Sequence, residues 1–402
     1  MTDTPARPIP YSITVQYDVV VVGARCAGAA TAMLLASAGH SVLLVDRSHF
    51  PSDTMSTHAI ARSGVALLNR WGLLQAVLDA GTSPIHEVVF NGGGISTSRM
   101  IKDRLGVDML VAPRRHVLDP LLVDAAVSAG AQLMTGVTID GVRRDGTGSV
   151  VGVHGHSAAG RIDIPARFVV GADGRVSRIA IAVDAPFSEV RVASGATHYA
   201  YFAGDWPAME YHLGDGMFAG VFPTNNSEAC VWVCSPAEEA RRIRRSNVTI
   251  SAAFDSMLRA AAPELADRLE TSATRTSKTM GVIGLPNHIR HPVGPGWALA
   301  GDAGYHRDAV TGHGISDAFR DAELLAAALD HILSGYADER RALATYHAER
   351  DAQLREIFEI TCELVTYPPV DRFIELQRLL SSAIEAQAGT LAARPLPSLA
   401  AA

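Results

Sequence analysis

Apolar residues near the start of the chain form two short continuous runs with a segment of small residues between them. The runs are YDVVVVG at 17–23 and HSVLLVD at 40–46, and each is typical of a parallel strand that is covered on both faces. Between them, residues 27–38 combine alanines with strong helix formers, and Gly39 stands where a helix is expected to end. The pattern predicts a strand, a glycine-rich turn, a helix and a second parallel strand.

The rest of the chain alternates between helical and strand periods. Apolar spacing predicts helices at 63–81 and 313–335, and a largely helical stretch at 340–388 that breaks near Pro368. A helix followed by a strand is predicted at 114–134. Strand patterns separated by turn residues predict β structure in three ranges, namely 86–112 with a hairpin turn at 91–96, 137–170 and 187–290. Charged helices are predicted among the strands of the last range, at 236–246 and 251–270.

Composition and charge narrow the class of protein. The 402 residues are 48% hydrophobic and 19% charged, which is typical of a chain that buries a substantial core. The net charge of −7 argues against a basic nucleic-acid-binding protein. No apolar run approaches the about 20 residues of a membrane-spanning helix. Residues 1–16 lack the apolar stretch of a signal peptide, so we expect a cytoplasmic protein.

The cysteines follow neither a disulfide framework nor the spacing of a zinc site. They are Cys26, Cys230, Cys234 and Cys362. Cys230 and Cys234 lie close enough in sequence to suggest a clip, but we interpret them as reduced, half-buried thiols. We therefore expect no metal site.

The first glycine-rich turn, Gly23-Ala24-Arg25-Cys26-Ala27-Gly28, follows the first predicted strand. In such a turn one glycine allows the tight bend, and another lets the helix approach the strand. The helix N-terminus then presents its amides to a pyrophosphate. Asp46 ends the second strand, where an acid holds the ribose hydroxyls of an adenine dinucleotide. Arg25 replaces the middle glycine, so this motif alone also fits another kind of α/β protein.

Two further turns carry a similar chemistry. The segment VVGADGRVSR at 169–178 and the segment LAGDAGYHRDAVTGHGISDAF at 299–319 each place an aspartate just after a predicted strand. Such an aspartate can accept hydrogen bonds from a polyol. The glycines at 312 and 314 allow a backbone to run against a flat ring. The helix that follows directs its positive end at an anion, such as the negative charge of a reduced flavin.

Together, the three turns resemble those of the flavoprotein aromatic hydroxylases, the FAD monooxygenases of the para-hydroxybenzoate hydroxylase type. The resemblance extends to their relatives, the geranylgeranyl reductases and the flavin-dependent halogenases. It runs from Tyr17 to about Gly335, and the patterns GADGxxS and GDAG…GxG…D carry it.

The resemblance implies a set of FAD contacts, residue by residue. Arg114 is one position off the family spacing, so Arg115 is the expected arginine. The implied residues are Gly23, Arg25, Ala27 and Gly28 at the pyrophosphate; Asp46, Arg47 and the backbone of Ile139 at the adenosine; Arg115 at the phosphate or ribityl region; Asp173 in a motif linked to both FAD and NAD(P)H; Asp302 at the ribityl chain; and Gly312 to Gly314 at the flavin ring.

The family pattern is not followed everywhere. Ala309 replaces the family proline of the third motif, and Ala180 replaces an arginine that often closes the second. Both changes fall where NAD(P)H would dock, and they put hydride delivery in doubt. The Trp-x-Trp-x-Ile-Pro signature of the halogenases is absent from the sequence, which argues against halogenation. No second complete nucleotide motif exists, so NADH or NADPH is expected only as a transient donor.

Other residues are candidates for chemistry. His58, His306 and His313 could each lie beside the flavin as a proton donor or substrate contact, or could be structural histidines. Aromatic residues of the β-rich stretch could line a substrate pocket, or could be ordinary sheet packing. They are Tyr199, Tyr201, Phe202, Trp206, Tyr211, Phe218, Phe222 and Trp232.

The recurrence of the turns predicts one nucleotide domain interrupted by another domain. The expected fold is α/β, a Rossmann-like FAD-binding domain with an interleaved β-rich substrate domain and a helical C-terminal segment. The expected parts are 17–85, 110–185 and 290–335 for the FAD-binding domain; 86–109 and 186–289 for the substrate domain; 336–388 for the helical segment; and 1–16 and 389–402 as flexible ends.

The expected function is that of an FAD-dependent, NAD(P)H-using monooxygenase. The resemblance implies that it uses O2, through a flavin C4a-hydroperoxide, to hydroxylate or epoxidise a small aromatic, polyketide-like or isoprenoid substrate. One alternative is a flavin-dependent reductase of a prenyl-type C=C bond. Another is a flavin-binding module without redox turnover. Under each of these functions we expect a monomer or a homodimer.

Overall fold

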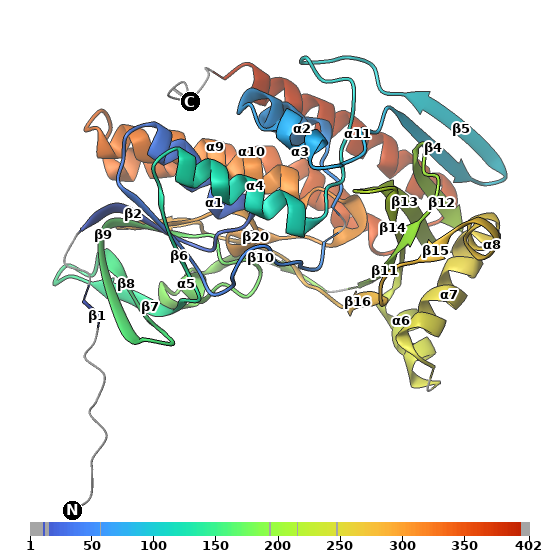
Figure 1. Cartoon of the computed structure of the whole chain (residues 1–402), viewed down its shortest axis with the longest axis horizontal. Coiled ribbons are helices and arrows are strands. Elements are labelled where there is room, and N and C mark those ends of the chain that lie inside the picture. The colour runs from blue at the N-terminus through green and yellow to red at the C-terminus, as the bar shows by residue number, and fades with distance from the viewer. Residues whose placement is uncertain are drawn as a thin grey trace, which may run out of the picture.

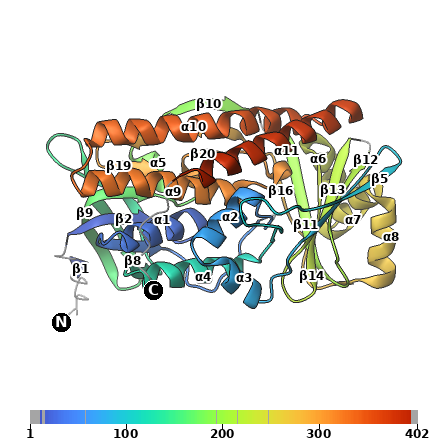
Figure 2. The same cartoon turned by 90° about the horizontal axis from the view of Figure 1, so that it is seen from above.

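The computed structural model describes residues 11–12, 16–56, 58–192, 194–214, 216–246 and 248–394. They form a mixed α/β structure with a mainly parallel sheet at one end and an eight-stranded sheet at the other (Figures 1 and 2). Three long helices run along the molecule beside the two sheets. They are α9 (Gly314–Leu333), α10 (Glu339–Leu364) and α11 (Val370–Ala392).

The parallel sheet begins with the unit that the sequence predicts. β2 (Tyr17–Val22) pairs in parallel with β3 (Val42–Asp46), and α1 (Cys26–Ser37) connects them. Gly39 follows α1 with a φ of 91°, the left-handed conformation in which helices commonly end. The predicted strand, turn, helix and strand are therefore confirmed.

Further strands extend this sheet in the order β18-β19-β9-β2-β3-β6. Neighbouring strands from β19 to β6 are parallel, which places their carboxyl ends at one edge. β8 pairs antiparallel with the first half of β9, and β7 pairs antiparallel with β8. The bounds are β6 (Gln132–Thr135), β7 (Thr138–Arg144), β8 (Val150–Ser157), β9 (Gly160–Gly171), β18 (Val293–Gly294) and β19 (Trp297–Leu299).

Both faces of the parallel sheet are covered. One face of β2 packs, through Val19 and Val21, against α1, α4 (Arg115–Ser128) and α9. The other face packs, through Val20 and Val22, against the β7–β9 layer and α5 (Arg178–Ala182). Alternate residues of a strand point to opposite faces, so burial on both sides explains the continuous apolar run.

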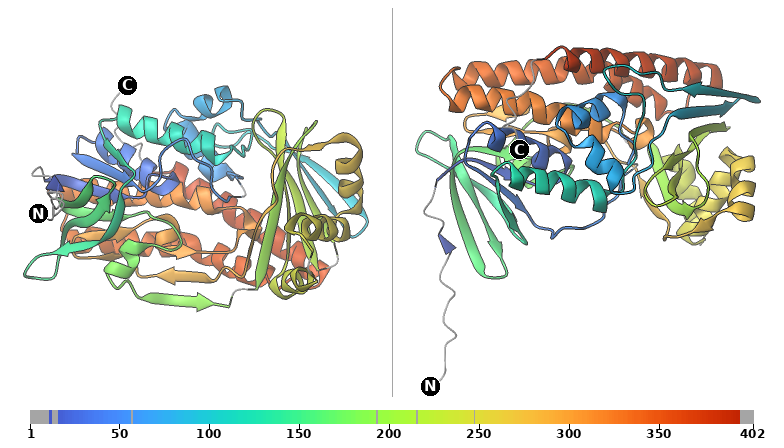
Figure 3. Two further views of the ribbon diagram at one scale, coloured as in Figure 1. Left: turned by 60° about the horizontal axis from the view of Figure 1, so that its bottom comes forward. Right: turned by 45° about the horizontal axis from the view of Figure 1, so that its top comes forward.

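The eight-stranded sheet forms the other half of the molecule in the order β15-β11-β14-β13-β12-β4-β5, with β16 paired to β11. Helices α6–α8 cover its face away from the parallel sheet (Figure 3), and α10 and α11 cover the other. The bounds are β4 (Glu87–Gly92), β5 (Ile95–Met100), β11 (Gly195–Ala203), β12 (Met209–Gly214), β13 (Met217–Pro223), β14 (Glu228–Pro236), β15 (Thr274–Arg275), β16 (Met280–Ile283), α6 (Ala237–Arg245), α7 (Ile250–Ala261) and α8 (Pro263–Ser272).

A small third sheet bridges the two larger ones. It consists of β10 (Phe187–Arg191), β17 (Asn287–Arg290) and β20 (Tyr305–His306), which pair antiparallel. Two short 3-10 turns flank β20 in sequence, η1 (Gly301–Ala303) and η2 (Ala309–Thr311).

Some expected boundaries are wrong. The helix expected at 63–81 is two helices, α2 (Arg62–Arg70) and α3 (Leu74–Asp79), because Gly72 takes a φ of 73° between them. α11 runs on to Ala392, past the expected end at 388. Within the expected flexible N-terminal segment, β1 (Tyr11–Ser12) pairs with β9, whereas the ends 1–10 and 395–402 lie outside the described residues.

The predicted hairpin turn and the predicted break between two helices are confirmed. The hairpin turn at 91–96 joins β4 and β5, with positive φ at Gly93 and Gly94 as a tight two-residue turn requires. The helical break near Pro368 separates α10 from α11. All four cysteines are free, but Cys26, Cys230 and Cys234 are buried rather than half-buried as expected. In the described part of the chain, the helices are too short or too polar to span a membrane, and no cluster of His, Cys, Asp or Glu suits a metal ion.

Candidate active site

The three glycine-rich turns leave the parallel sheet at the same edge. β2, β9 and β19 lie side by side and end at Val22, Gly171 and Leu299. The turns are joined by backbone hydrogen bonds: the Ala172 amide donates to the Val22 carbonyl at 2.8 Å, and the Ala300 amide to the Gly171 carbonyl at 3.0 Å. Open α/β sheets bind ligands outside the carboxyl ends of their strands. The turns therefore line one site.

Close packing explains the glycines of the first and third turns. A Cβ atom on Gly28 would overlap the carbonyl oxygen of Gly23, and one on Gly23 would overlap the carbonyl oxygen of Ala172. A Cβ atom on Gly301 would lie 3.0 Å from the Cβ atom of Ala27. The first turn thus touches both the second turn and the third.

The start of α1 offers backbone donors to an anion. No side chain caps this helix, so the amides of its first turn are left for a ligand or water, and the helix dipole makes this end positive. Asp46 is fixed beside the turn, because its carboxylate accepts from the amides of Ala24 and Ser48, both at 2.7 Å. A carboxylate has further acceptor positions, so Asp46 can still hold a ribose hydroxyl.

A buried carboxylate that the sequence analysis missed holds both arginines of the predicted site. Asp119, on α4, has no exposed surface and forms ion pairs with Arg25 and, at 2.8 Å, with Arg115. Arg25 also donates to the Ser52 hydroxyl at 3.1 Å. Two cations share one carboxylate, and the excess positive charge beside α1 favours a phosphate. The sequence did contain a signal of the ion pair between Arg115 and Asp119, because the two residues are four positions apart in a predicted helix.

The third turn places an acid and two glycines at the open side of the site. Asp302 is exposed, and its charge acts on the Arg115 guanidinium. Gly312 adopts a φ of 67°, which directs the chain into α9. Gly314 begins α9, and a Cβ atom there would meet no other atom within 4 Å. The N-terminal end of α9 therefore faces free space.

Beneath the third turn lies a buried ionic network that the sequence analysis also missed. Arg320, which has no exposed surface, donates to Asp317 at 2.9 Å, to Asp321 at 2.7 Å and to the Tyr305 hydroxyl at 2.8 Å. Asp321 in turn accepts from the Gly301 amide at 2.9 Å. The network ties η1 and β20 to α9 and so fixes the shape of the third turn.

Three other predicted residues lie near the edge of the site. The Asp173 carboxylate caps α5, accepting from the Ser177 hydroxyl at 2.5 Å and the Arg178 amide at 2.6 Å. The Ile139 carbonyl accepts from Arg178 at 3.5 Å, and Arg47 is exposed. The contacts predicted for these residues with FAD and NAD(P)H stay predictions.

His58 lies between the glycine-rich turns and the eight-stranded sheet. It is fully buried, its Nε2 atom bonds the Tyr201 hydroxyl, and its Nδ1 atom has no hydrogen-bond partner among the residues that the structure describes. Burial first, and then the nearby charge of Arg115, lower the pKa of His58 to about 3. Its φ of 62° is uncommon for a residue other than glycine and is typical of functional sites.

The other two histidines occupy different surroundings. His306 is in the small third sheet, where its Nδ1 atom bonds the Pro286 carbonyl at 2.9 Å and its ring stacks on His288. His313 precedes α9, and its Nδ1 atom bonds the Thr311 carbonyl. Burial first, and then Arg307, lower the pKa of His313 to about 4, and within the described ranges its Nε2 atom has no hydrogen-bond partner. His58 and His313 are thus brought to the site, whereas His306 has a structural environment.

The aromatic residues of the eight-stranded sheet divide between its two faces. Phe202 and Trp206 pack on the face that α6–α8 cover. The other six belong to the face toward α10 and α11, together with Ala59 and Val310, which come from the loop of His58 and from η2. The six are Tyr199, Tyr201, Tyr211, Phe218, Phe222 and Trp232. An aromatic face therefore borders the third turn.

A family model described as the FAD binding domain matches residues 16–361. The chain belongs to this FAD-binding family. It is thus an FAD-dependent oxidoreductase, as the sequence patterns indicate, and a resemblance to the para-hydroxybenzoate hydroxylase type is confirmed at the level of the family.

Relatives within the FAD-binding family carry different chemistries in their names. The 2,4-dichlorophenol 6-monooxygenase of Delftia acidovorans is 24% identical over 89% of this chain, which spans only 64% of that enzyme's length. A digeranylgeranylglycerophospholipid reductase of Methanopyrus kandleri is 25% identical over 91% of the chain and 94% of the reductase. The solved structure of the flavin-dependent brominase Bmp2 shares the fold with a TM-score of 0.79, at 19% identity over 93% of this chain and 94% of the brominase.

The residues of the site fit the FAD that the family implies. The uncapped start of α1 and the charges of Arg25 and Arg115 suit a pyrophosphate, and Asp46 suits a ribose. Asp302 suits a ribityl chain. The space before Gly314 suits a flat ring that the positive end of α9 would face.

Gly314→Ala is expected to weaken FAD binding by about tenfold or more without weakening the fold, because the added methyl group would meet only the cofactor. Gly389→Ala is the matched control: Gly389 also lies in a helix with free space around its Cα, so the variant is expected to bind FAD like the wild type. The measurements are FAD titrations and urea unfolding of the apoproteins. Equal FAD affinity of the two variants would contradict this placement of the flavin ring.

Proposed function

We propose that the chain is a monooxygenase that uses NADH or NADPH and O2 to hydroxylate or epoxidise a small aromatic, polyketide-like or isoprenoid substrate. The observation that carries the proposal is the position of the aromatic face. It contacts Val310, two residues before Gly312, and Ala59, next to His58. A flat or apolar molecule at the edge of this face, next to Val310 and Ala59, would lie beside a flavin ring held at Gly312 and Gly314.

Bound FAD would supply the redox chemistry, accepting a hydride from the nicotinamide and activating O2. The chain's own residues bind and orient it. The start of α1, Arg25 and Arg115 would hold the diphosphate, and the N-terminal end of α9 would stabilise negative charge on the ring. The apolar face excludes water from the reacting atoms.

His58 would position an oxygen atom of the substrate. In the described part of the chain, the Tyr201 hydroxyl has only His58 as a hydrogen-bond partner. Both groups are satisfied when this hydroxyl donates to Nε2, which leaves the hydrogen on Nδ1. Because the pKa of His58 is about 3, the ring stays neutral at physiological pH and offers Nδ1–H as a donor. A substrate carbonyl or hydroxyl oxygen would satisfy this buried donor.

Two variants of His58 distinguish the roles of its two ring nitrogen atoms. In His58→Asn the amide nitrogen falls near the place of Nδ1 and tolerates the φ of 62°, whereas in His58→Gln it falls near the place of Nε2. We expect the Asn variant to keep the substrate KM within about threefold, and the Gln variant to raise it about tenfold or more, because only Gln loses the donor. FAD affinity should be unchanged in both. A larger KM for the Asn variant would contradict the assignment to Nδ1.

The buried neutral His58 also predicts how stability depends on pH. Its pKa is about 3 in the folded chain and 6.5 when exposed. As the pH falls below about 6.5, the unfolded chain takes up a proton that the folded chain does not, so stability is lost progressively down to about pH 3. Urea unfolding of His58→Asn should therefore show a smaller loss between pH 7 and pH 4 than the wild type. If the free energy of unfolding fell equally with pH in His58→Asn and in the wild type, the neutral, buried state of His58 would be refuted.

The proposed reaction is tested by isotopic labelling of the product. The FAD-loaded protein is incubated with NADPH or NADH, isotopically labelled O2 and a panel of phenols, polycyclic aromatics and prenyl compounds. We expect one labelled oxygen atom in a product of at least one compound. Hydrogenated products without labelled oxygen would instead identify a reductase.

One observation keeps the reductase as a second candidate. Ala180, which stands in place of the family arginine, is fully buried beneath the sheet, so a cation for docking NAD(P)H has no place there. A flavin in this site would then depend on another electron donor, and reduction of a prenyl-type C=C bond would be the expected activity. A flavin that accepts electrons from no donor would leave only the binding module.

A further inference from the structure

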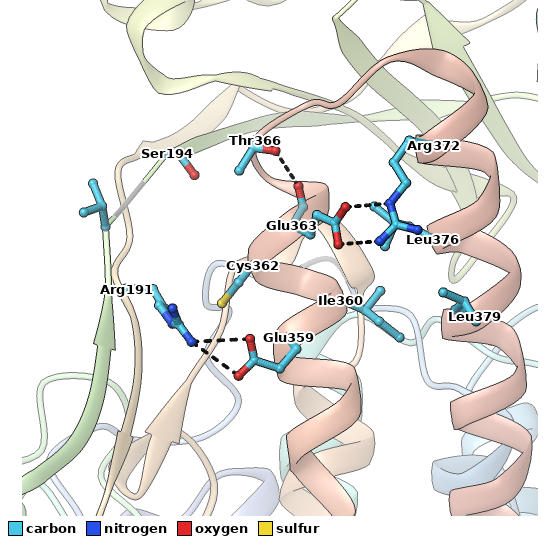
Figure 4. A pocket seen from close by; sticks show the side chains of 11 residues that line it. Arg191, Ser194, Glu359, Ile360, Cys362, Glu363, Thr366, Arg372, Leu376 and Leu379 are labelled. Atoms are coloured by element: carbon cyan, nitrogen blue, oxygen red, sulfur yellow. Dashed lines mark hydrogen bonds and ion pairs between the residues drawn. The ribbon is translucent and has the colours of Figure 1, made fainter.

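A cavity of about 480 Å³ opens between the end of β10 and the helices α10 and α11 (Figure 4). This volume is within the range of small-molecule sites. The cavity is separate from the turns that hold the cofactor. Its lining has two kinds of surface, paired charges on the walls and apolar side chains between them.

The charges in the cavity compensate one another. Arg191 lies 3.4 Å from Glu359, and Arg372 pairs with Glu363 at 2.6 Å and 2.8 Å (Figure 4). Each arginine also pairs with a second carboxylate outside the cavity, one on β10 and one on α11. A charged ligand would therefore find no free counter-charge, and would lose hydration on entering.

The apolar part of the lining leads toward the proposed reaction site. Ile360 and Leu376 line the cavity and also belong to the cluster that packs on the aromatic face. The residue after Ile360, Thr361, lies 3.5 Å from the hydroxyl of Thr311, which directly precedes Gly312. One turn of α10 thus separates the cavity from the third glycine-rich turn.

Two hydroxyl groups line the cavity. One belongs to Ser194, which follows β10 in sequence (Figure 4). The other belongs to Thr366, which donates to the Glu363 carbonyl at 2.7 Å and keeps its oxygen atom as an acceptor. These groups could accept or donate one hydrogen bond to a ligand that is otherwise apolar.

We propose that this cavity binds an uncharged, mainly aromatic molecule that carries a hydroxyl or amino group, and that it is where the substrate of the oxygenation enters. The binding of such a molecule stands on the lining alone. Its identity as the entering substrate rests on the proposed function.

Cys362 provides a probe of the cavity that needs no turnover. It lines the cavity and is half-buried, whereas the other three cysteines are buried. Burial, then the carboxylate of Glu359, raise the pKa of the Cys362 thiol to about 12, so its alkylation is slow enough to follow by mass spectrometry. A molecule in the cavity would shield this thiol.

The test measures alkylation of Cys362 by N-ethylmaleimide in the FAD-loaded protein at pH 7.5, with 2-naphthol or the anion 2-naphthoate present. We expect saturating 2-naphthol to slow alkylation by about fivefold or more, and 2-naphthoate to have little effect. Leu379→Trp, which fills the mouth of the cavity, should abolish the protection. Leu133→Trp is the matched control, because Leu133 is 38% exposed, against 41% for Leu379, and lies on β6 outside the cavity.

Each outcome bears on the proposal. The proposal would be overturned if 2-naphthol did not slow the alkylation of Cys362, or if 2-naphthoate slowed it equally. It would also be overturned if 2-naphthol still slowed the alkylation in Leu379→Trp. Protection by 2-naphthol in a protein whose flavin accepts no electrons from NADH or NADPH would leave the binding site standing and remove the proposed monooxygenase function. Flavin reduction by NADH or NADPH, without protection of Cys362 by 2-naphthol, would remove the binding site and leave the proposed monooxygenase function standing.

Discussion

Asp119→Asn is expected to lower the free energy of unfolding by about 3–5 kcal/mol and to weaken FAD binding by about tenfold or more. The substitution keeps the shape of the side chain but removes the charge of a carboxylate that has no exposed surface and pairs with both Arg25 and Arg115. Without this counter-charge the two guanidinium groups repel each other and are no longer held in the arrangement that suits a phosphate. Urea unfolding of the apoprotein and fluorescence titration with FAD measure the two effects.

Asp124→Asn is the control for this prediction. Asp124 lies on the same helix, α4, and its side chain is exposed. Its substitution is expected to change the free energy of unfolding by less than about 0.5 kcal/mol. If Asp119→Asn were as stable as this control and bound FAD as tightly as the wild type, the carboxylate would not organise the site.

Arg320→Met is expected to cost about 3–5 kcal/mol of folding free energy, because it leaves the buried carboxylates of Asp317 and Asp321 without their shared cation. Those two acids and the Tyr305 hydroxyl hold the third turn against α9. The expected loss appears in urea unfolding of the apoprotein. Arg340→Met, at an exposed position, is the control and should be close to the wild type.

The same variant separates a structural role from a cofactor contact. Arg320 is fully buried beneath the third turn, and its bonds go to residues of the chain. Under conditions in which Arg320→Met is still folded, the FAD spectrum of the loaded protein should resemble that of the wild type. A variant with normal stability and altered flavin absorption would contradict the structural role.

Much of the cofactor domain could be predicted from the sequence, because its physical causes are local. The buried strands β2 and β3 are continuous apolar runs, and the turns between strands and helices need glycine wherever a Cβ atom would overlap the backbone, as at Gly28. Residues that follow adjacent parallel strands must meet at one edge of the sheet. The convergence of the three turns follows from this rule.

The sequence did not predict interactions that depend on distant segments. Asp119 and Arg25 are 94 positions apart, and His58 and Tyr201 are 143 positions apart. The period of a strand shows that residues alternate between two faces, but it does not show which face a helix will cover. For this reason the sequence groups Phe202 and Trp206 with the residues of the aromatic face, although they pack on the other face of the same sheet. The break at Gly72 was missed because the apolar period continues across it.

The ionic residues near the glycine-rich turns form two groups with different functions. Arg25 and Arg115 lie beside the start of α1, where a phosphate is expected, and their shared carboxylate limits the excess charge. Arg320 lies deeper, and it and Arg307 pair with the two carboxylates of Asp317 and Asp321, so this group adds no net charge to the site. Binding of FAD should therefore depend on ionic strength through the first group and not the second.

The central claim, that bound flavin is reduced by a nicotinamide and then reacts with O2, is tested most directly by an anaerobic titration of the FAD-loaded protein with NADH and NADPH. We expect at least one nicotinamide to bleach the flavin band near ~450 nm, and we expect the band to return when air is admitted. The titration is repeated with the phenol panel, because a bound substrate can accelerate the reduction. Bound flavin that neither nicotinamide bleaches, with or without the panel, would contradict the account.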